Sequence, residues 1–401
     1  MGVGMLGACA ARHLADVGVD VALVGPAEPT PRRVDPDAHA ARTVHSSHED
    51  VARVCRTVDP DPIRAWLGHR SVAQFGELAT RTGIAVVDPV GHLWVEAAPG
   101  LDLVAASGER FDRNCVRRDA STTMAAFPFL GAFPEGAGGD PPETLWEPPP
   151  AGSVNPWAYV RAETAAALAG GAHRIEALVG AVSDGQGGAV ELTTDIGPVH
   201  ADRVLLATGA FSGHGTTPAS GLDLEYALHT QLLVHLDGDE ANRLAGMPSI
   251  IGKFADPIDD FYLTPPVPDP LARGDRWILK IGAPQDDHVR VAPADLAAWF
   301  RTDGDPNFTA NLARILDRLI PDLRGVDRWT TSCVTTYTPS GHPFIDWLSD
   351  RVACAVGGNG YAAKCAPALG ELAALLFQGG STDRDWPTEV DRDPFRARYT
   401  G

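Results

Sequence analysis

Lysine is nearly absent from this chain of 401 residues. Only three of its 33 basic residues are lysines, namely Lys253, Lys280 and Lys364, and the other 30 are arginines. Abundant Ala, Gly, Pro, Asp and Arg beside this scarcity indicate a GC-rich coding bias, in which arginine is the default cation. Because an ammonium and a guanidinium differ in shape and hydrogen bonding, each lysine is a candidate for a specific chemical role.

Long apolar runs are missing as well. No stretch reaches the roughly 18 uninterrupted apolar residues of a membrane-spanning helix, so we expect no membrane partner. The net charge of −19 argues against nucleic acid, whose partners present a basic face. An apolar content of 44% and a charged content of 21% exclude a disordered or fibrous chain. The length predicts two or three structural units.

Paired cysteines are absent too. The six cysteines contain no CxxC spacing, so they form neither a disulfide framework nor a zinc site. Residues 6–9 (LGAC) resemble a lipidation box, but the basic start and long apolar run of a signal peptide are missing. We therefore expect a cytoplasmic, monomeric protein with reduced thiols.

The start of the chain follows the pattern of a dinucleotide-binding unit. A GxGxxG pattern is formed by Gly2, Gly4 and Gly7. It precedes a predicted helix over 8–17 and an apolar strand over 19–24. Such glycines let the backbone approach a pyrophosphate at the helix N-terminus. The strand before the glycines is missing, and Gly25 replaces the acidic residue for the ribose. Either the true start lies upstream, which we favour, or this strand has been lost.

Further elements of the same kind occur in the middle and at the end of the chain. Helices are predicted over 59–83, 157–169, 293–301, 308–319 and 367–377. Strands are predicted over 84–87, 92–96, 178–182, 189–194, 203–207 and 352–356, with a strand-rich block over 226–281. Residues 133–156 are predicted to form a long loop rich in Pro and Gly. Strands alternating with helices predict an α/β fold.

This pattern predicts a Rossmann-like domain with a second, antiparallel-sheet domain inserted into it. The first, discontinuous domain would comprise residues 1–85, 151–222 and 323–401. The second would comprise residues 86–150 and 223–322.

The order of these elements resembles the FAD-dependent amine oxidase family, which includes D-amino acid oxidase and glycine oxidase. The greatest similarity is to monomeric sarcosine oxidase and N-methyltryptophan oxidase. The resemblance implies FAD as cofactor, a small amino acid or amine as substrate, and O₂ as electron acceptor. Besides the glycines of the first turn, it implies a cofactor contact from Thr208 and Gly209, which directly follow the strand over 203–207. Four local motifs carry the rest of the resemblance.

The first motif is residues 47–56 (SHEDVARVCR). It resembles the stretch in which two arginines three residues apart reach the flavin site, which implies cofactor contacts from Ser47, His48 and Arg53. The second arginine of the family's pair binds the substrate carboxylate, and here it would be Arg56. A guanidinium suits a carboxylate because it donates two parallel hydrogen bonds. The alternative is a solvated helix face.

The second motif is residues 277–282 (WILKIG). It resembles the strand that carries the family's oxygen-activating lysine, here Lys280, whose fixed charge would stabilise developing superoxide. The alternative is an outward-facing edge lysine, although the setting is apolar. The family's histidine four residues on is replaced by Pro284. Tyr262 corresponds loosely to a pocket tyrosine of the family, with packing in the core or at the rim as an equal alternative.

The third motif is residues 331–339 (TSCVTTYTP). It resembles the segment in which a cysteine, here Cys333, is joined to the flavin 8α-methyl as a thioether. A nearby cation such as Arg53 would favour the thiolate that this reaction requires. The alternative is a small buried apolar side chain, the usual state of a free cysteine. An aromatic residue expected two positions later is Thr335.

The fourth motif is residues 357–364 (GGNGYAAK). It resembles the family's closing strand, loop and helix, whose lysine, here Lys364, is the second ligand of the substrate carboxylate. The backbone of the loop would approach the flavin, and a helix N-terminus would favour negative charge on the reduced ring. The implied cofactor residues are Gly357, Gly358, Asn359, Gly360 and Tyr361. The alternative for Lys364 is a surface lysine at a helix start.

Together these motifs imply oxidation of a C–N bond to an imine, with O₂ reduced to hydrogen peroxide. A flavin dehydrogenase that passes electrons to a quinone or a carrier protein is one alternative. A degenerate, flavin-free binding protein is another, since the first strand and the acidic residue are missing. An NAD-dependent dehydrogenase is the third, and Gly25 counts against it as well.

Overall fold

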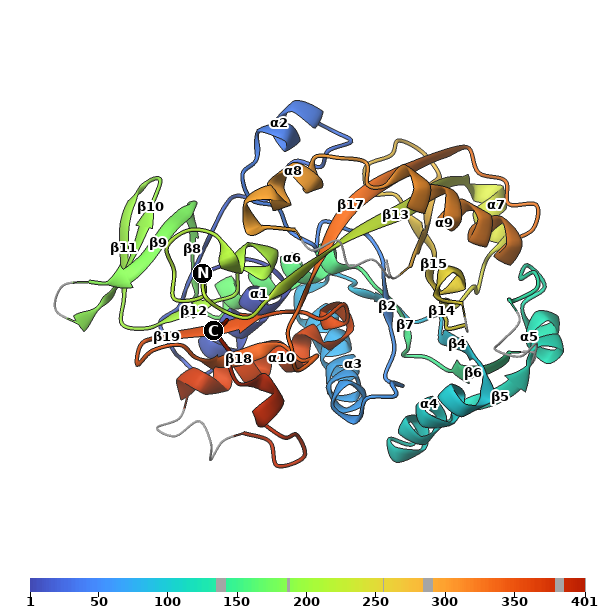
Figure 1. Ribbon diagram of the computed structural model, residues 1–401, viewed down its shortest axis with the longest axis horizontal. Helices are drawn as coiled ribbons and strands as arrows, with labels where there is room; N and C mark the ends of the chain where they lie inside the picture. The colour runs from blue at the N-terminus through green and yellow to red at the C-terminus, as the bar shows by residue number, and fades with distance from the viewer. Residues whose placement is uncertain (135–141, 186–187, 255, 284–290, 379–385, 401) are drawn as a thin grey trace.

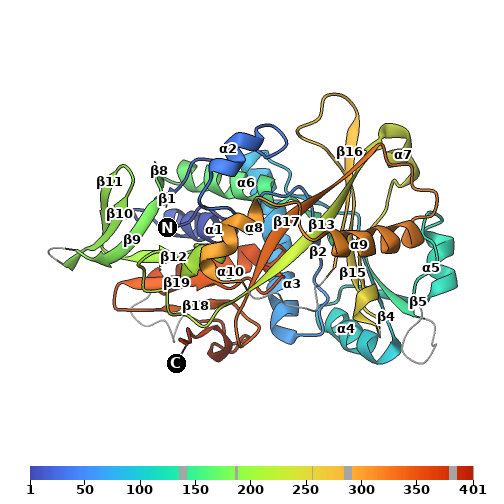
Figure 2. The same cartoon turned by 45° about the horizontal axis from the view of Figure 1, so that its top comes forward.

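The computed structural model describes residues 1–134, 142–185, 188–254, 256–283, 291–378 and 386–400 (Figure 1). Two sheet systems lie side by side, and the long strands β13 (Glu225–Asp237) and β17 (Asp327–Tyr337) run from one to the other (Figures 1 and 2). Both ends of the chain lie in the same half of the molecule, which also contains β12 (Val204–Leu206). Within the described residues, no helix combines the length and apolarity needed to cross a bilayer.

The first half is the dinucleotide-binding part. Strand β1 (Ala22–Gly25) pairs in parallel with β8 (His173–Glu176), and β12 pairs in parallel with β19 (Val352–Val356). β18 (Phe344–Trp347) extends the second pair in antiparallel fashion.

Met1 and Gly2 lie between these two pairs. The Met1 backbone donates to Leu205 O at 2.9 Å and accepts from Ala207 N, while Gly2 N donates to Val24 O. These two residues therefore occupy the sheet position between β1 and β12.

Helices far apart in the sequence pack together in this half. α1 (Met5–Asp16) packs against α6 (Pro156–Ala169) and α10 (Ala362–Gln378), and α3 (Pro62–Thr82) packs against α10. The ends of α3 follow from local chemistry: the Asp61 carboxylate accepts from two backbone N–H groups at its start. Pro62 provides a preset φ, and Gly83 ends the helix with φ +72°, a left-handed conformation that glycine adopts readily.

The second half is built on one sheet of eight strands. Their order is β17, β13, β16 (Arg276–Gly282), β15 (Phe261–Pro268), β14 (Ser249–Gly252), β4 (His92–Glu96), β6 (Glu143–Glu147) and β5 (Val116–Asp119). All neighbours are antiparallel except β14 and β4. This confirms the predicted α/β fold, with a dinucleotide-binding part and an antiparallel substrate-domain sheet.

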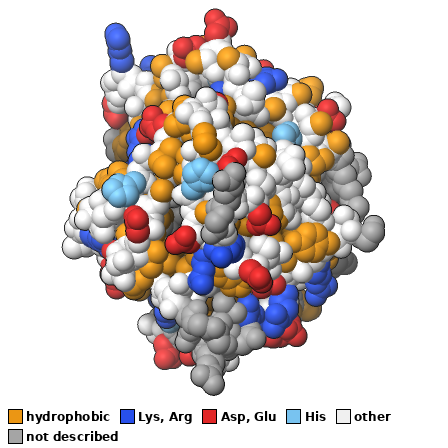
Figure 3. Space-filling view, turned by 90° about the vertical axis from the view of Figure 1, so that its left-hand side faces the viewer, with side chains coloured by type: hydrophobic (Ala, Val, Ile, Leu, Met, Phe, Trp, Pro, Cys, Tyr) orange, Lys and Arg blue, Asp and Glu red, His pale blue; other side chains and the backbone are white. Residues whose placement is uncertain are grey.

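The remaining elements form two small sheets and six α-helices of the described residues. Two further sheets are β9 (Val179–Asp184), β10 (Val190–Thr194) and β11 (Gly197–Ala201), and β2 (Arg53–Cys55), β7 (Gly152–Val154) and β3 (Val87–Asp88). The other helices are α2 (Pro36–Ala41), α4 (Ala98–Arg110), α5 (Ala120–Ala126), α7 (Gly238–Arg243), α8 (Leu296–Phe300) and α9 (Pro306–Leu319). On the face that carries β9–β11, acidic and basic side chains are interspersed among hydrophobic ones (Figure 3).

The predicted loop over 133–156 is wrong in part, because β6 and β7 lie within it. Its prolines and glycines surround these strands, and the composition of the whole stretch concealed them. Residues 135–141 lie outside the described part of the chain. The domain boundaries stay a prediction; β17, from the segment assigned to the first domain, pairs with β13 of the large sheet.

Candidate active site

The first glycine turn is packed too closely for side chains. A Cβ on Gly7 would lie 2.0 Å from Gly2 O, and one on Gly2 would lie 2.2 Å from Ala207 O. At Gly4 a Cβ would meet nothing nearer than His48 Nδ1 at 3.7 Å, so the turn is open on that side. Two of the glycines therefore hold the turn against the sheet, and the third leaves its outer face accessible.

The helix that follows is suited to an anion. The N-cap of α1 is Gly4, which provides no side-chain cap, and the first turn has no acidic residue, so its first N–H groups remain available. Thr208 pairs its hydroxyl with Ser212 at 2.9 Å, and Gly209 next to it has φ +55° with open space at its Cβ position. These features fit the pyrophosphate of FAD. Gly25 offers no carboxylate to the ribose.

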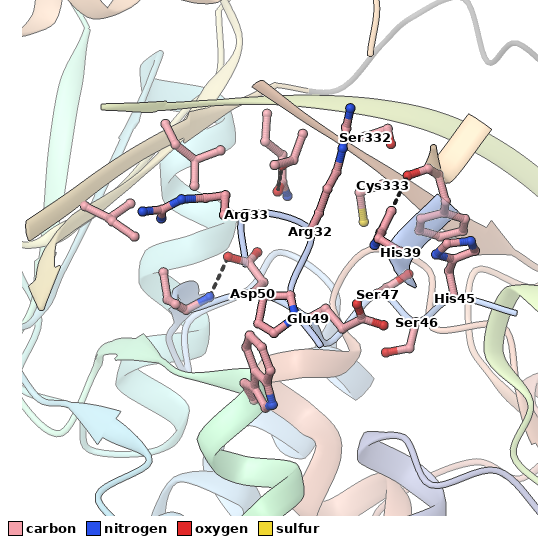
Figure 4. Close-up of a pocket in the computed structure, with 18 of the residues that line it drawn as sticks. Arg32, Arg33, His39, His45, Ser46, Ser47, Glu49, Asp50, Ser332 and Cys333 are labelled. Carbon is pink, nitrogen blue, oxygen red and sulfur yellow. Dashed lines mark hydrogen bonds between the residues drawn. The ribbon is translucent and has the colours of Figure 1, made fainter. Parts of the chain in front are cut away.

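A pocket of about 150 Å³ lies between residues 31–53 and the strands β13, β16 and β17. Cys333 projects its sulfur from β17 into this pocket, opposite Ser46 and Ser47 (Figure 4). Part of the wall is aromatic, because His45 stacks on Phe300 at 5.1 Å. Burial lowers the pKa of His45 to about 3, so this wall is uncharged and suits an apolar ring edge.

Two of the three predicted cofactor residues of the first motif, Ser47 and Arg53, line the same pocket. Arg53 Nη2 lies 3.6 Å from Cys333 Sγ and 3.0 Å from Ser47 O. The Ser47 hydroxyl donates to Val334 O at 2.9 Å, which fixes residues 47–53 to β17. His48 is neutral, since burial lowers its pKa to about 4. The structure thus brings Arg53 to the cysteine, as the resemblance implies.

Lys280 is fully buried and pairs with a carboxylate that the sequence analysis left unassigned. Its ammonium donates to Asp50 Oδ2 and Ala52 O, and Arg53 Nε lies 2.6 Å from the same Asp50 oxygen. Burial lowers the pKa of Lys280 to about 8, against the opposing effect of Asp50. Burial would raise the pKa of Asp50, but the two cations outweigh it and hold that pKa below its ordinary value.

A second cluster repeats this arrangement. Arg56 Nη1 and Lys364 Nζ both bind Asp59 Oδ2, at 2.8 and 2.7 Å. Burial opposes ionisation of Asp59, but the two cations hold its pKa well below the usual range. The structure therefore brings Arg56 and Lys364 together, as the resemblance implies, and places a carboxylate of the chain between them.

Tyr262 lies next to the first cluster. Its ring centre is 5.9 Å from Lys280 Nζ, and its hydroxyl accepts from Gln231 Nε2 at 3.0 Å. Gln231 lines the pocket, whereas Pro284 lies outside the described residues. Tyr262 is thus close to the lysine, with its hydroxyl already bonded.

Side chains of the closing glycine loop (residues 357–361) stabilise its conformation. Asn359 has φ +48° and its side chain bonds Thr338 N and Gly357 O, so it shapes the turn. Tyr361 pairs its hydroxyl with His342 at 3.0 Å and its ring with Arg64. The backbone at Gly357, Gly358 and Gly360 leads directly into α10, which carries Lys364.

Sequence reasoning missed Asp50, Asp59 and His92. Each aspartate stands three residues from one of the two arginines, and this spacing was the available signal for both. His92 is fully buried on β4, and its Nε2 has no hydrogen-bond partner among the described residues. Nothing in the local sequence distinguishes it from a core histidine.

Solved structures of similar fold come from amino acid and amine enzymes. NikD, an unusual amino acid oxidase essential for nikkomycin biosynthesis, matches with a TM-score of 0.72 at 18% identity, over 99% of this chain and 96% of NikD. L-Proline dehydrogenase from P. horikoshii matches with 0.70 at 17%, over 98% and 95%. Glycine oxidase from Geobacillus kaustophilus matches with 0.68 at 19%, over 100% and 98%. These likenesses show the fold.

Curated protein sequences yield no match. The family model described as FAD dependent oxidoreductase (DAO), in contrast, matches residues 1–376. This range contains the glycine turn, the pocket and both charged clusters. The chain belongs to the DAO family of FAD-dependent oxidoreductases.

Proposed function

We propose that this protein oxidises the C–N bond of an amino acid or a related amine to an imine and reduces O₂ to hydrogen peroxide, as sarcosine oxidase-like enzymes do. One observation carries the proposal. Two lysines from distant parts of the chain, Lys280 and Lys364, each pair with a buried aspartate of the segment 50–59. In a chain that otherwise uses arginine, two buried lysines around one ten-residue segment indicate a built site.

The residues that would hold FAD are the glycine turn, the start of α1, Thr208, Gly209 and the pocket residues around Cys333. A bound FAD would supply the redox chemistry, namely uptake of a hydride from the substrate and transfer of electrons to O₂. Arg56 and Lys364 would orient the substrate, since charged groups held in place fix a reacting bond. Lys280 would keep a positive charge where negative charge develops on oxygen.

Arg53 and Cys333 support a covalent attachment. The Arg53 guanidinium lies 3.6 Å from Cys333 Sγ, and the sulfur points into the pocket (Figure 4). Denaturing the purified protein and measuring the mass of the peptide that contains Cys333 tests this proposal. Flavin mass on that peptide is the expected result, and Cys333→Ser should release all flavin into the supernatant. Free FAD released from the denatured wild type would overturn the covalent linkage but not the oxidase proposal.

The oxidase reaction itself is tested by anaerobic mixing of the flavin-loaded protein with a panel of amino acids, N-methyl amino acids and amines. Bleaching of the flavin absorbance, followed by peroxide release after admission of oxygen, is the expected result. A purified protein that stays colourless in the presence of FAD would contradict the proposal and favour a flavin-free binding protein.

A dehydrogenase is a second candidate, because Asp50 partly offsets the charge of Lys280. With less net positive charge at that position, Lys280 would stabilise the negative charge that develops on O₂ less strongly. Measuring peroxide release against reduction of a dye at limiting oxygen separates the two candidates. Fast dye reduction with little peroxide would favour a quinone or carrier protein as acceptor.

A further inference from the structure

The cation pair assigned to the substrate already holds a carboxylate. Asp59 Oδ2 accepts from Arg56 Nη1 at 2.8 Å and from Lys364 Nζ at 2.7 Å. These residues come from the segment after β2 and from the first turn of α10, respectively. The geometry is that of a carboxylate bound by two cations, with the chain itself supplying the carboxylate.

Asp59 is held firmly in this position. Its side chain is only 1% exposed. Its other oxygen, Oδ1, accepts from Asp61 N at 3.1 Å, and its own N–H donates to Ser107 Oγ at 3.0 Å. Arg56 is fixed as well, because its guanidinium stacks over Trp94 at 4.5 Å. An incoming carboxylate would have to displace a ligand that is bonded on both oxygens.

A second carboxylate beside Asp59 would also meet a like charge. In a buried site, two carboxylates sharing the same partners repel each other strongly. The nearby Glu147 does not relieve this repulsion. Its buried carboxylate accepts from the backbone N–H groups of Thr57 and Val58, and it is paired with Arg113 at 3.3 Å. The cluster is therefore poorly suited to a free carboxylate.

The same neighbourhood offers a neutral polar group. Burial, together with the charges of Arg56 and Lys364, lowers the pKa of His92 well below its ordinary value, so the imidazole is uncharged. Its Nδ1 pairs with Ser249 at 3.0 Å, and its Nε2 has no partner among the described residues. A neutral imidazole can bond an amide, ester or hydroxyl without adding charge.

We propose that Asp59 takes the place of a substrate carboxylate, so that the oxidised C–N bond belongs to an amine without a free carboxylate beside it. The substrate class is then a simple amine, or an amino acid whose carboxyl group is amidated or esterified. This inference rests on the proposed function, and Asp59 acts as its specificity determinant.

The first test uses acetate as a probe of the vacated position. Asp59→Ala removes the carboxylate and leaves two buried cations unpaired, so the variant should melt at a lower temperature than the wild type. Acetate, but not an equal concentration of chloride, should raise the melting temperature of the variant. By calorimetry, acetate should bind the variant at least about tenfold more tightly than the wild type.

Two further variants keep this test decisive. Asp317→Ala removes a carboxylate from a surface ion pair with Arg328, and it should show no response specific to acetate. Asp59→Ser also vacates the carboxylate position but keeps a small polar side chain, and it replaces Asp59→Ala should that variant fail to fold. Equal acetate affinity in the wild type and the Asp59 variant would overturn the proposal.

The second test compares two substrates that differ only at the carboxyl group. For the flavin-loaded wild type, kcat/KM for sarcosinamide should exceed that for sarcosine by about tenfold or more, and Asp59→Asn should reduce this ratio. A preference of the wild type for sarcosine would overturn the inference and leave the oxidase proposal standing. Failure of every amine to reduce the flavin would overturn the proposed function, while the acetate test would still decide the role of Asp59.

Discussion

Lys364 Nζ lies 2.7 Å from Asp59 Oδ2, although the two residues are separated by 305 positions in the chain. Lys280 pairs in the same way with Asp50. Each aspartate is also bonded to an arginine three residues away, Arg56 for Asp59 and Arg53 for Asp50. The two clusters share one design, with a lysine, an arginine and a single buried carboxylate, and each keeps an excess of one positive charge.

Replacing Lys280 should separate the two half-reactions of the enzyme. Lys280→Met removes the cation beside developing superoxide, so reoxidation by O₂ should slow by about 10²-fold, the scale of losing one fixed electrostatic group. Reduction of the flavin by substrate should change much less. Stopped-flow absorbance measures both rates, and Lys253→Met, which removes a partly exposed lysine paired with Asp260, is the matched control. Equal reoxidation rates in the two variants would show that Lys280 has no part in oxygen chemistry.

The pH profile of reoxidation gives an independent check on Lys280. Its pKa is lowered to about 8 by burial, so the ammonium is present below that pH and is lost as the pH rises through it. The rate constant with O₂ should therefore be highest near neutral pH and fall above about pH 8. In Lys280→Arg the cation persists to high pH, and the fall should disappear. A wild-type profile that rises with pH would contradict this assignment.

Lys364 should matter for stability more than a surface lysine does. Lys364→Met leaves the buried Asp59 carboxylate with Arg56 as its one cationic partner, and we expect a loss of about 3 kcal/mol in the free energy of unfolding. Lys253→Met breaks an ion pair in which the lysine is 38% exposed, and it should change stability by less than about 1 kcal/mol. Urea unfolding of both variants measures the difference. Similar losses would mean that burial of the Asp59 pair has no special energetic weight.

The fold was predictable because hydrophobic period and turn residues are local signals. The helix predicted over 157–169 matches α6 (Pro156–Ala169), and the strand predicted over 352–356 matches β19. β6 and β7 were hidden, because their strand character lies in pairing with distant partners: β4 for β6, and β2 and β3 for β7.

The candidate site was predictable only in part. The resemblance supplied the cations at Arg53, Arg56, Lys280 and Lys364, but it could not supply the anions. Asp50 and Asp59 are ordinary acidic residues in a chain with 52 of them. Their role in the two clusters depends on burial beside lysines more than 200 positions away in the chain. Such burial is set by the tertiary fold.

The glycine turn leads to a prediction about replacing glycine by alanine. The replacement should stabilise the protein at one helical position and destabilise it at another. Gly7 and Gly76 both lie inside helices, α1 and α3, where alanine is favoured over glycine by about 0.5–1 kcal/mol. A Cβ at Gly76 would meet nothing within 4 Å, whereas at Gly7 it would lie 2.0 Å from Gly2 O.

Gly76→Ala should therefore stabilise the protein by about 0.5–1 kcal/mol. Gly7→Ala should destabilise it by about 1–3 kcal/mol, the scale of overpacking. Because the turn must shift to admit the new methyl group, Gly7→Ala should also retain less FAD after gel filtration. Thermal unfolding and the ratio of flavin to protein absorbance measure these effects. Full FAD content in Gly7→Ala would show that the close approach of helix and turn is not required for binding.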